Sequence, residues 1–156
     1  MAISQTVQHF MVERSVDYDL MQHNPTGSSH ETAMSARIPE DHLAKAVVVK
    51  DKKGYAMIVV PANNWVEMKH LRKELNRGFH LATENEIARL FSDCDAGAVP
   101  PIGPAYDMET FVDESLLNLS SVYFESGDHQ ELVHILGRGF QELMSGVRHG
   151  HYSHYH

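Results

Sequence analysis

The chain of 156 residues is poor in cysteine and in long apolar runs, and both deficits exclude whole classes of protein. A single cysteine, Cys94, permits no internal disulfide, so a disulfide-stapled scaffold is excluded and a reducing, cytoplasmic location is expected. No apolar run approaches the roughly 20 residues that a membrane-spanning helix needs, so no membrane partner is expected. Residues 1–16 have no basic start followed by an apolar core, so no secretory signal is expected either.

Basic residues are also scarce, since 13 Lys and Arg stand against 21 Asp and Glu and give a net charge of −8. Over the whole chain, this charge argues against a partner as anionic as nucleic acid. Nine of the bases, however, lie in residues 37–77, where five acids leave a net charge of +4, and the remainder carries −12. This asymmetry permits a local anion-binding face, although solvated charges on a helix and a hairpin turn would give the same counts.

Common catalytic signatures are missing as well. The sequence has no nucleophile elbow, no phosphate-binding loop, no dinucleotide fingerprint and no zinc-protease motif, so we expect no cofactor and no metal. Asp93 and Asp95 flank Cys94 and disfavour its thiolate, which makes this cysteine a poor nucleophile. The histidine-rich residues 149–156 could hold a soft divalent ion, so a stress or metal protein is one alternative.

What is present is an interleaved series of strands and helices, with a hairpin as the strongest signal. Apolar, β-branched runs at residues 43–49 and 55–60 flank a short turn that contains Gly54. Other strands are expected near residues 16–20, 79–81, 110–112 and 122–124. Residues 129–136 fit the periods of a strand and of a helix equally well.

Several helices have recognisable ends. Ser4 is the expected N-cap of the first helix, and Asn64 is the expected N-cap of a helix that Gly78 ends. Thr83 and Glu86 form a capping box for the next helix. The sequence predicts one α/β (α+β) domain over residues 1–148, with a mixed sheet and no internal repeat, followed by a His- and Tyr-rich tail at residues 149–156.

Three features could carry chemistry. Lys45 interrupts an otherwise buried strand, so its ammonium must reach solvent or a ligand; it is either a snorkelling lysine or the cation at the floor of a cleft. The Gly- and Pro-rich residues 97–103 either form an ordinary rigid connector or present backbone N–H groups to an oxyanion. His129 follows a glycine turn and either relays a proton or is one more surface histidine.

Together these features resemble the YbaK family of aminoacyl-tRNA deacylases, which is related to the editing domain of bacterial prolyl-tRNA synthetases. The resemblance extends from about Tyr18 to Leu143. Its anchors are residues 23–29, 43–48, 54–61, 81–83, Phe91, and residues 97–103, 112–116 and 127–129. Their order and spacing, more than any single motif, carry the resemblance.

The resemblance implies a mixed, strongly curved sheet or partly open barrel flanked by helices. It also implies hydrolysis of the ester that joins a wrong amino acid to the 3′ end of a tRNA. In this reading Lys45 matches the essential lysine of the family, and Gly97 and Pro101 match its glycine-to-proline loop, which includes Ala98. His129 matches the histidine of the synthetase editing domains.

The remaining correspondences concern substrate binding. His23, Thr26, Ser28 and Ser29 fall where relatives line the amino-acid pocket, and Asp113 matches a recurrent aspartate without an assigned role. The resemblance implies a freestanding enzyme whose partner is the tRNA acceptor end, and it leaves open whether the enzyme acts alone or docked on an aminoacyl-tRNA synthetase. The alternative is a non-catalytic tRNA- or synthetase-binding module of the same fold. Neither the edited amino acid nor the oligomeric state follows from the sequence.

Overall fold

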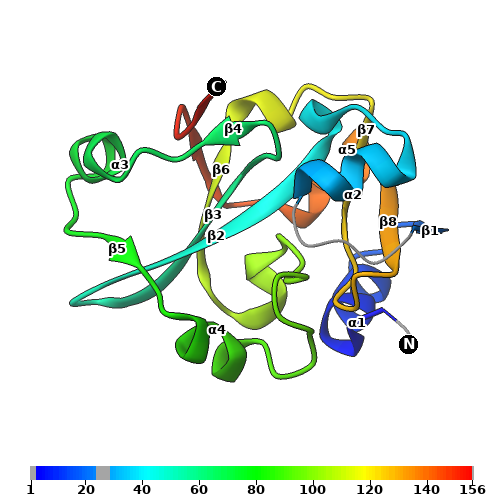
Figure 1. The fold of residues 1–156 in the computed structure, drawn as a ribbon, viewed down its shortest axis with the longest axis horizontal. Coiled ribbons are helices and arrows are strands. Elements are labelled where there is room, and N and C mark those ends of the chain that lie inside the picture. Colours follow the sequence, from blue (N-terminus) through cyan, green and yellow to red (C-terminus); the bar gives the residue numbers. More distant parts are fainter. Residues whose placement is uncertain (1–2, 24–28, 156) are drawn as a thin grey trace.

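A computed structural model describes residues 3–23 and 29–155, and a long β-hairpin crosses the centre of the molecule (Figure 1). Strand β2 (Leu43–Asp51) and strand β3 (Gly54–Pro61) pair antiparallel and are joined by Lys52 and Lys53. The predicted hairpin is therefore confirmed. Most of its β-branched side chains are buried, because the hairpin is packed on both faces.

Strands far apart in the sequence extend this hairpin into one mixed sheet in the order β1-β8-β7-β2-β3-β6-β9, with β5 also paired to β2. The pairs β2–β7, β3–β6 and β6–β9 are parallel, and the others in this sheet are antiparallel. The added strands are β1 (Asp19–Gln22), β5 (His80–Leu81), β6 (Glu109–Asp113), β7 (Ser121–Glu125), β8 (Glu131–Leu136) and β9 (Arg148–Gly150). The ambiguous segment is thus a strand, because β1 and β7 on either side complete its backbone hydrogen bonds.

One edge of β2 is only partly covered. Strand β7 pairs with residues 43 and 44, and β5 pairs with residues 49 and 50 of the same edge. Between them, no strand of the described chain pairs with residues 45–48 on this edge, although the Ala82 N–H donates to the Val48 carbonyl. The resulting gap in the sheet lies beside the position of Lys45.

Helices flank the sheet on both sides (Figure 1). The α-helices of the described residues are α1 (Gln5–Glu13), α2 (Ser29–Ala36), α3 (Met68–Leu75), α4 (Glu84–Leu90) and α5 (Gly137–Leu143). The Ser4 hydroxyl caps α1 and Thr83 and Glu86 form a capping box on α4, so both predicted caps are confirmed. No helix within the described ranges has the length and apolar character needed to cross a bilayer.

The predicted bounds of α3 are wrong at both ends. Strand β4 (Asn64–Trp65) occupies the expected cap position, pairs with strand β10 (His154–Tyr155), and delays the helix until Met68. The helix ends at Asn76, whose φ of 53° supplies the left-handed cap expected from Gly78. The spacing of nearby residues does not reveal that β4 pairs with the far end of the chain. Asn64 was therefore wrongly predicted as the N-cap of this helix.

Different helices cover the two faces of the hairpin, with α3 and α4 on opposite sides of it in Figure 1. Leu71 and Leu75 of α3 pack with Tyr152 in one core cluster. Helices α1, α4 and α5 pack against the larger cluster on the other face, which includes Phe124 and Phe140. The described part of the expected tail, residues 149–155, contributes most of β9, all of β10 and the buried Tyr152 to the fold.

Candidate active site

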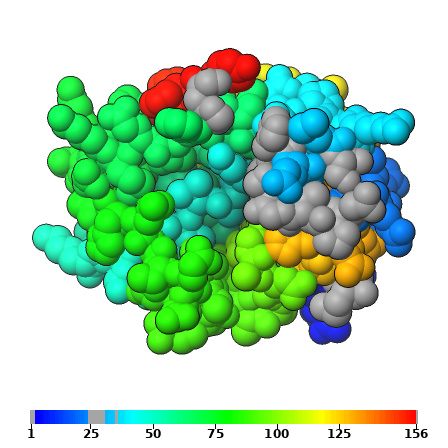
Figure 2. All heavy atoms as spheres, in the orientation of Figure 1, coloured from blue at the N-terminus to red at the C-terminus, as the bar shows by residue number. Residues whose placement is uncertain are grey.

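A cavity of about 210 Å³ opens at the uncovered edge of β2. Apolar residues of β2, of α4 and of the loop after α4 form most of its wall, and its charged residues are Lys45, Glu84 and Glu125. In Figure 2 the teal atoms of the hairpin lie recessed beside the green segment that contains α4. The sheet gap is therefore hollow at the surface, and charged groups of both signs reach it.

Lys45 lies on β2 where β7 turns away. Its Nζ donates to the Ala62 carbonyl at 3.3 Å and so uses one of the three ammonium donors. Burial lowers the pKa of this lysine, and the charge of Glu40 opposes that shift. No carboxylate in the described part of the chain lies within 4 Å of Nζ, so the ammonium retains donors for a ligand.

The Gly97 loop is a tight turn tied to the end of the neighbouring strand. The Ala98 N–H donates to the Asp95 carbonyl at 3.1 Å, and the Asp95 N–H donates to the Gly127 carbonyl at 2.7 Å. Gly97 has a φ of +79°, which suits the third position of a type II turn. The Ala98 N–H is used within the turn, whereas no backbone hydrogen bond among the described residues uses the N–H groups of Gly97 and Val99, which line the cavity.

His129 lies directly against this turn. A Cβ added to Gly97 would lie 3.2 Å from His129 Cε1, so glycine is needed there for space as well as for backbone conformation. The Nε2 of His129 hydrogen-bonds to the Ala96 carbonyl. A carbonyl oxygen only accepts, so Nε2 carries the proton and Nδ1 of the neutral ring is the acceptor.

Glu125 is the residue of the cavity that sequence reasoning missed. It ends β7 and comes directly after Phe124, which is paired with Ala44, so it adjoins Lys45 where the two strands diverge. Its side chain lines the cavity, and the residue is 9% exposed. Burial raises its pKa, and the charges of His23 and His129 oppose that shift. A polar residue that ends an apolar strand run, two positions before a glycine turn, was the only signal in the sequence.

The structure places the other predicted residues less uniformly. His23 is buried, and its Nε2 lies 3.3 Å from Glu125 Oε1. Ala98 and Pro101 are buried beneath the turn, outside the cavity wall. Three further predictions cannot be placed in the same way: Thr26 and Ser28 lie outside the described residues, and only the backbone of Ser29 is described, at the start of α2.

Asp113 lies away from the cavity and holds the C-terminal segment. Its Oδ1 accepts from the Ser115 N–H at 3.1 Å and from the Ser115 hydroxyl at 2.7 Å. Its Oδ2 accepts from the Tyr152 N–H at 3.1 Å and from the Ser153 hydroxyl at 2.7 Å. All this acceptor capacity is used internally, so the geometry gives the recurrent aspartate an anchoring role in place of the expected contact with substrate.

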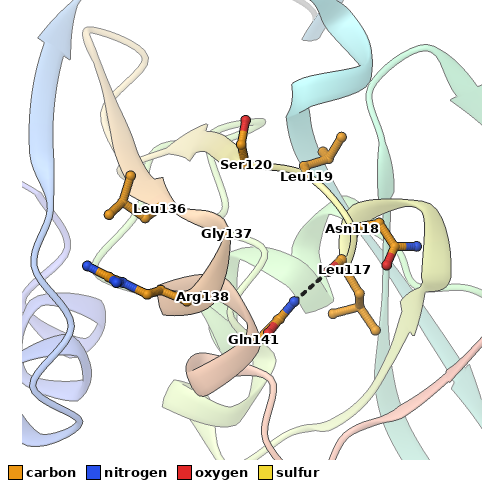
Figure 3. Close-up of a pocket in the computed structure, with 8 residues that line it drawn as sticks. All are labelled: Leu117, Asn118, Leu119, Ser120, Leu136, Gly137, Arg138 and Gln141. Carbon is orange, nitrogen blue, oxygen red and sulfur yellow. Dashed lines mark hydrogen bonds between the residues drawn. The ribbon is translucent and has the colours of Figure 1, made fainter.

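A second hollow, of about 500 Å³, lies between residues 117–120 and the start of α5 (Figure 3). Arg138 is the charged residue that lines it, and Gln141 Nε2 donates to the Leu117 carbonyl at 2.7 Å. It offers no acid–base pair. Across the described ranges, no three His, Cys, Asp or Glu side chains are grouped as metal ligands.

The family model for the aminoacyl-tRNA editing domain matches residues 23–143. No protein with a curated description matches the chain.

Solved structures share the whole fold at low sequence identity. The hypothetical protein APE2540 has a TM-score of 0.82 and 23% identity, covering 96% of this chain and 100% of its own. A protein described as a candidate trans-editing enzyme for prolyl-tRNA synthetase has a TM-score of 0.81 and 20% identity, covering 97% and 96%. A protein from Marinobacter aquaeolei VT8 assigned to signal transduction has a TM-score of 0.75 and 18% identity, covering 95% of this chain but 30% of its own. These likenesses establish the fold, and the expected mixed α/β architecture is confirmed.

Proposed function

This chain belongs to the aminoacyl-tRNA editing domain family, and on that premise we propose that it is a deacylase acting in trans. It hydrolyses the ester between a small amino acid and the 3′ end of a mischarged tRNA. One observation carries the proposal: Lys45 and Gly97, which lie far apart in the sequence, line one cavity at the open edge of β2, and His129 lies directly against the Gly97 turn. Ester hydrolysis can use a cation to hold the substrate, backbone N–H groups to stabilise the oxyanion and a histidine to accept a proton, and these groups lie close together here.

Negative charge develops on the ester carbonyl oxygen as water adds. The N–H groups of Gly97 and Val99 are the donors available to stabilise this oxyanion, an effect worth about 3–4 kcal/mol for one well-placed donor. Because the Asp95–Ala98 turn and its bond to Gly127 fix the backbone before substrate arrives, these donors need little reorganisation. Lys45 holds the terminal phosphate or ribose and so places the ester against them.

Among the described residues that line the cavity, no side chain is a suitable nucleophile, so water is the attacking group in this proposal. Burial raises the pKa of Cys94 to about 12, which keeps its thiol protonated and unreactive. His129 can accept a proton at Nδ1 while Nε2 remains bonded to Ala96, so it orients and accepts from the attacking water. The ribose hydroxyl next to the ester can assist from the substrate side.

The size of the cavity selects the amino acid. Ala44, Ala46 and Val48 of β2 form its floor, and Ile87 and Val99 narrow it from the other side. The cavity of about 210 Å³ can hold an alanine, serine, cysteine or threonine ester, and we expect its shape to disfavour larger side chains. Since one methylene changes discrimination by about 1–3 kcal/mol, neighbouring small amino acids should be separated only partly.

The acidity of the protein limits how much RNA it holds. With a net charge of −8, the protein can bind the acceptor end through a few phosphates near the cavity, but not an extended RNA surface. Its affinity should be modest, and the logarithm of its binding constant should change little with the logarithm of salt concentration.

A panel of mischarged tRNAs tests the proposal. We expect the protein to release a small amino acid from at least one of them above the uncatalysed rate, and Lys45→Ala to abolish this release while the protein remains folded. Lys53→Ala removes an exposed lysine from the hairpin turn and should leave the rate unchanged. Binding of tRNA without hydrolysis of any ester would favour a non-catalytic module, and full activity of a folded Lys45→Ala protein would contradict the role of the lysine.

A further inference from the structure

We propose that Glu125 binds the α-ammonium group of the substrate's amino acid, so that the enzyme accepts esters with a free amine and rejects those whose amine is acylated. This inference rests on the proposed function and deepens it, because it defines the chemical class of the acyl group. It starts from a buried carboxylate that lines the cavity and that no step of the hydrolysis described above employs.

The carboxylate of Glu125 is under-satisfied in the described structure. Both Oε1 and Oε2 are shielded from solvent without a hydrogen bond of normal geometry, although the Thr32 hydroxyl lies near enough to oppose the rise in the pKa of this carboxyl. The His23 Nε2 lies 3.3 Å from Oε1 but is not aligned for a hydrogen bond, and it approaches only one of the two oxygens. An ionised carboxylate has about four acceptor sites, and a buried charge is retained at great cost unless a partner completes them.

The surroundings of Glu125 favour a cation over an anion as that partner. Asp128 lies close enough for its negative charge to act on Glu125, and its Oδ2 is also buried without a hydrogen bond. The Oδ1 of Asp128 is occupied by Ser126, Gln130 and Glu131. The carboxylates of Glu125 and Asp128 therefore lie together at this end of the cavity, beside the rings of His23 and His129.

Lys45 does not neutralise Glu125. Both residues line the cavity from adjoining strands, yet their charged groups are more than 4 Å apart and form no ion pair among those of the described residues. The cavity therefore presents a cation and a carboxylate separately, with the Gly97 turn also in its wall. An aminoacylated tRNA end has the matching groups, since it carries backbone phosphates, an ester carbonyl and an α-ammonium group with three donors.

A blocked amine would lose this match. An N-acetylated amino acid offers one neutral amide N–H, which leaves the buried charge of Glu125 mostly uncompensated. Loss of a hydrogen-bonded partner for a buried charge typically lowers affinity by about 10- to 100-fold. The enzyme should therefore discriminate against N-acylaminoacyl-tRNA and peptidyl-tRNA, although their ester bonds are the same.

The test compares two esters of the same tRNA. The ester that is hydrolysed fastest in the mischarged panel is prepared with a free amine and after N-acetylation, and kcat/KM is measured for both. We expect the wild-type protein to prefer the free amine by about 10- to 100-fold. Glu125→Gln preserves the volume of the side chain and removes its charge. It should lower kcat/KM for the ester with a free amine and keep kcat/KM for the acetylated ester within about threefold of the wild-type value. The preference for the free amine should therefore disappear.

Glu84→Gln is the matched control, because it removes the same charge from the exposed rim of the same cavity. It should change the rates on both esters by the same factor. Equal wild-type rates on the two esters would overturn the proposal, as would an equal loss on both in Glu125→Gln, which is the signature of a general base. If Glu125→Gln fails to fold, the wild-type comparison alone still decides. Failure of the proposed function looks different, since neither ester would then be hydrolysed.

Discussion

Gly97→Ala should affect both stability and catalysis, and its effect on Tm can be measured separately from its effect on kcat. At a φ of +79° an alanine strains the chain by about 1–2 kcal/mol. In a protein of this size, 1 kcal/mol corresponds to roughly 2–4 °C in Tm, so Tm should fall by about 2–8 °C. The new Cβ would also lie 3.2 Å from His129 Cε1, so the ring or the turn must shift by a few tenths of an ångström.

That shift has a separate effect on activity. It moves the N–H groups of the turn relative to the ester and disturbs the hydrogen bond between His129 and Ala96. Loss of one well-placed oxyanion donor typically lowers kcat by about 10²–10³-fold, and we expect Gly97→Ala to show a loss of this size. The assay is kcat for the ester hydrolysed in the mischarged panel, measured beside a thermal melt.

Gly146 supplies a matched control at the same backbone conformation. Its φ is +80°, and an added Cβ would meet no heavy atom within 4 Å. Gly146→Ala should therefore show the fall in Tm that comes from backbone strain alone, while retaining full kcat. Equal activity of the two variants would refute the reasoning, because the Gly97 turn would then contribute only as a connector.

Two further predictions concern stability. Asp113→Asn should lower the free energy of unfolding by about 2–3 kcal/mol, because an amide donor would face the Tyr152 and Ser153 donors; urea unfolding measures this, and no loss would contradict the anchoring role. Hydrogen bonds from Arg77 lower the pKa of Asp51 to about 2, below its usual 3.8, so the stability that this pair contributes is complete above pH 4 and is lost as the pH falls through 2. Asp51→Asn should remove this part of the decline in Tm between pH 4 and pH 2, and an unchanged decline would contradict the assignment.

Local sequence patterns predict some elements of the fold and fail for others. The β2–β3 hairpin and the Thr83–Glu86 capping box depend on residues close together in the sequence, so their spacing sufficed. Strand β4 and the start of α3 depend on pairing with residues near the C-terminus, which removes Asn64 from its expected role. Long-range pairing leaves no local periodicity, so errors of this kind are expected wherever distant strands meet.

The site divides in a similar way. Lys45 could be singled out because burial of an ammonium in an apolar strand is unfavourable without a partner. Gly97 and His129 were each ambiguous alone, and only the resemblance brought them together before the structure did. Glu125 could not be identified from the sequence, since its burial depends on β7 turning away from β2 one residue after Phe124.

The uncovered edge of β2 explains why these groups meet at one place. An exposed strand edge normally invites pairing with another chain, which natural proteins avoid by covering it. Here β7 departs after Phe124 and β5 covers only residues 49 and 50, so the edge stays open over residues 45–48. Residues of α4 and of the Gly97 turn complete the wall of the cavity there, whose volume of about 210 Å³ can hold a small acyl group. In the register of β5, residues 82–85 would have to continue the strand to cover residues 45–48, so the shortness of β5 is a condition for the site.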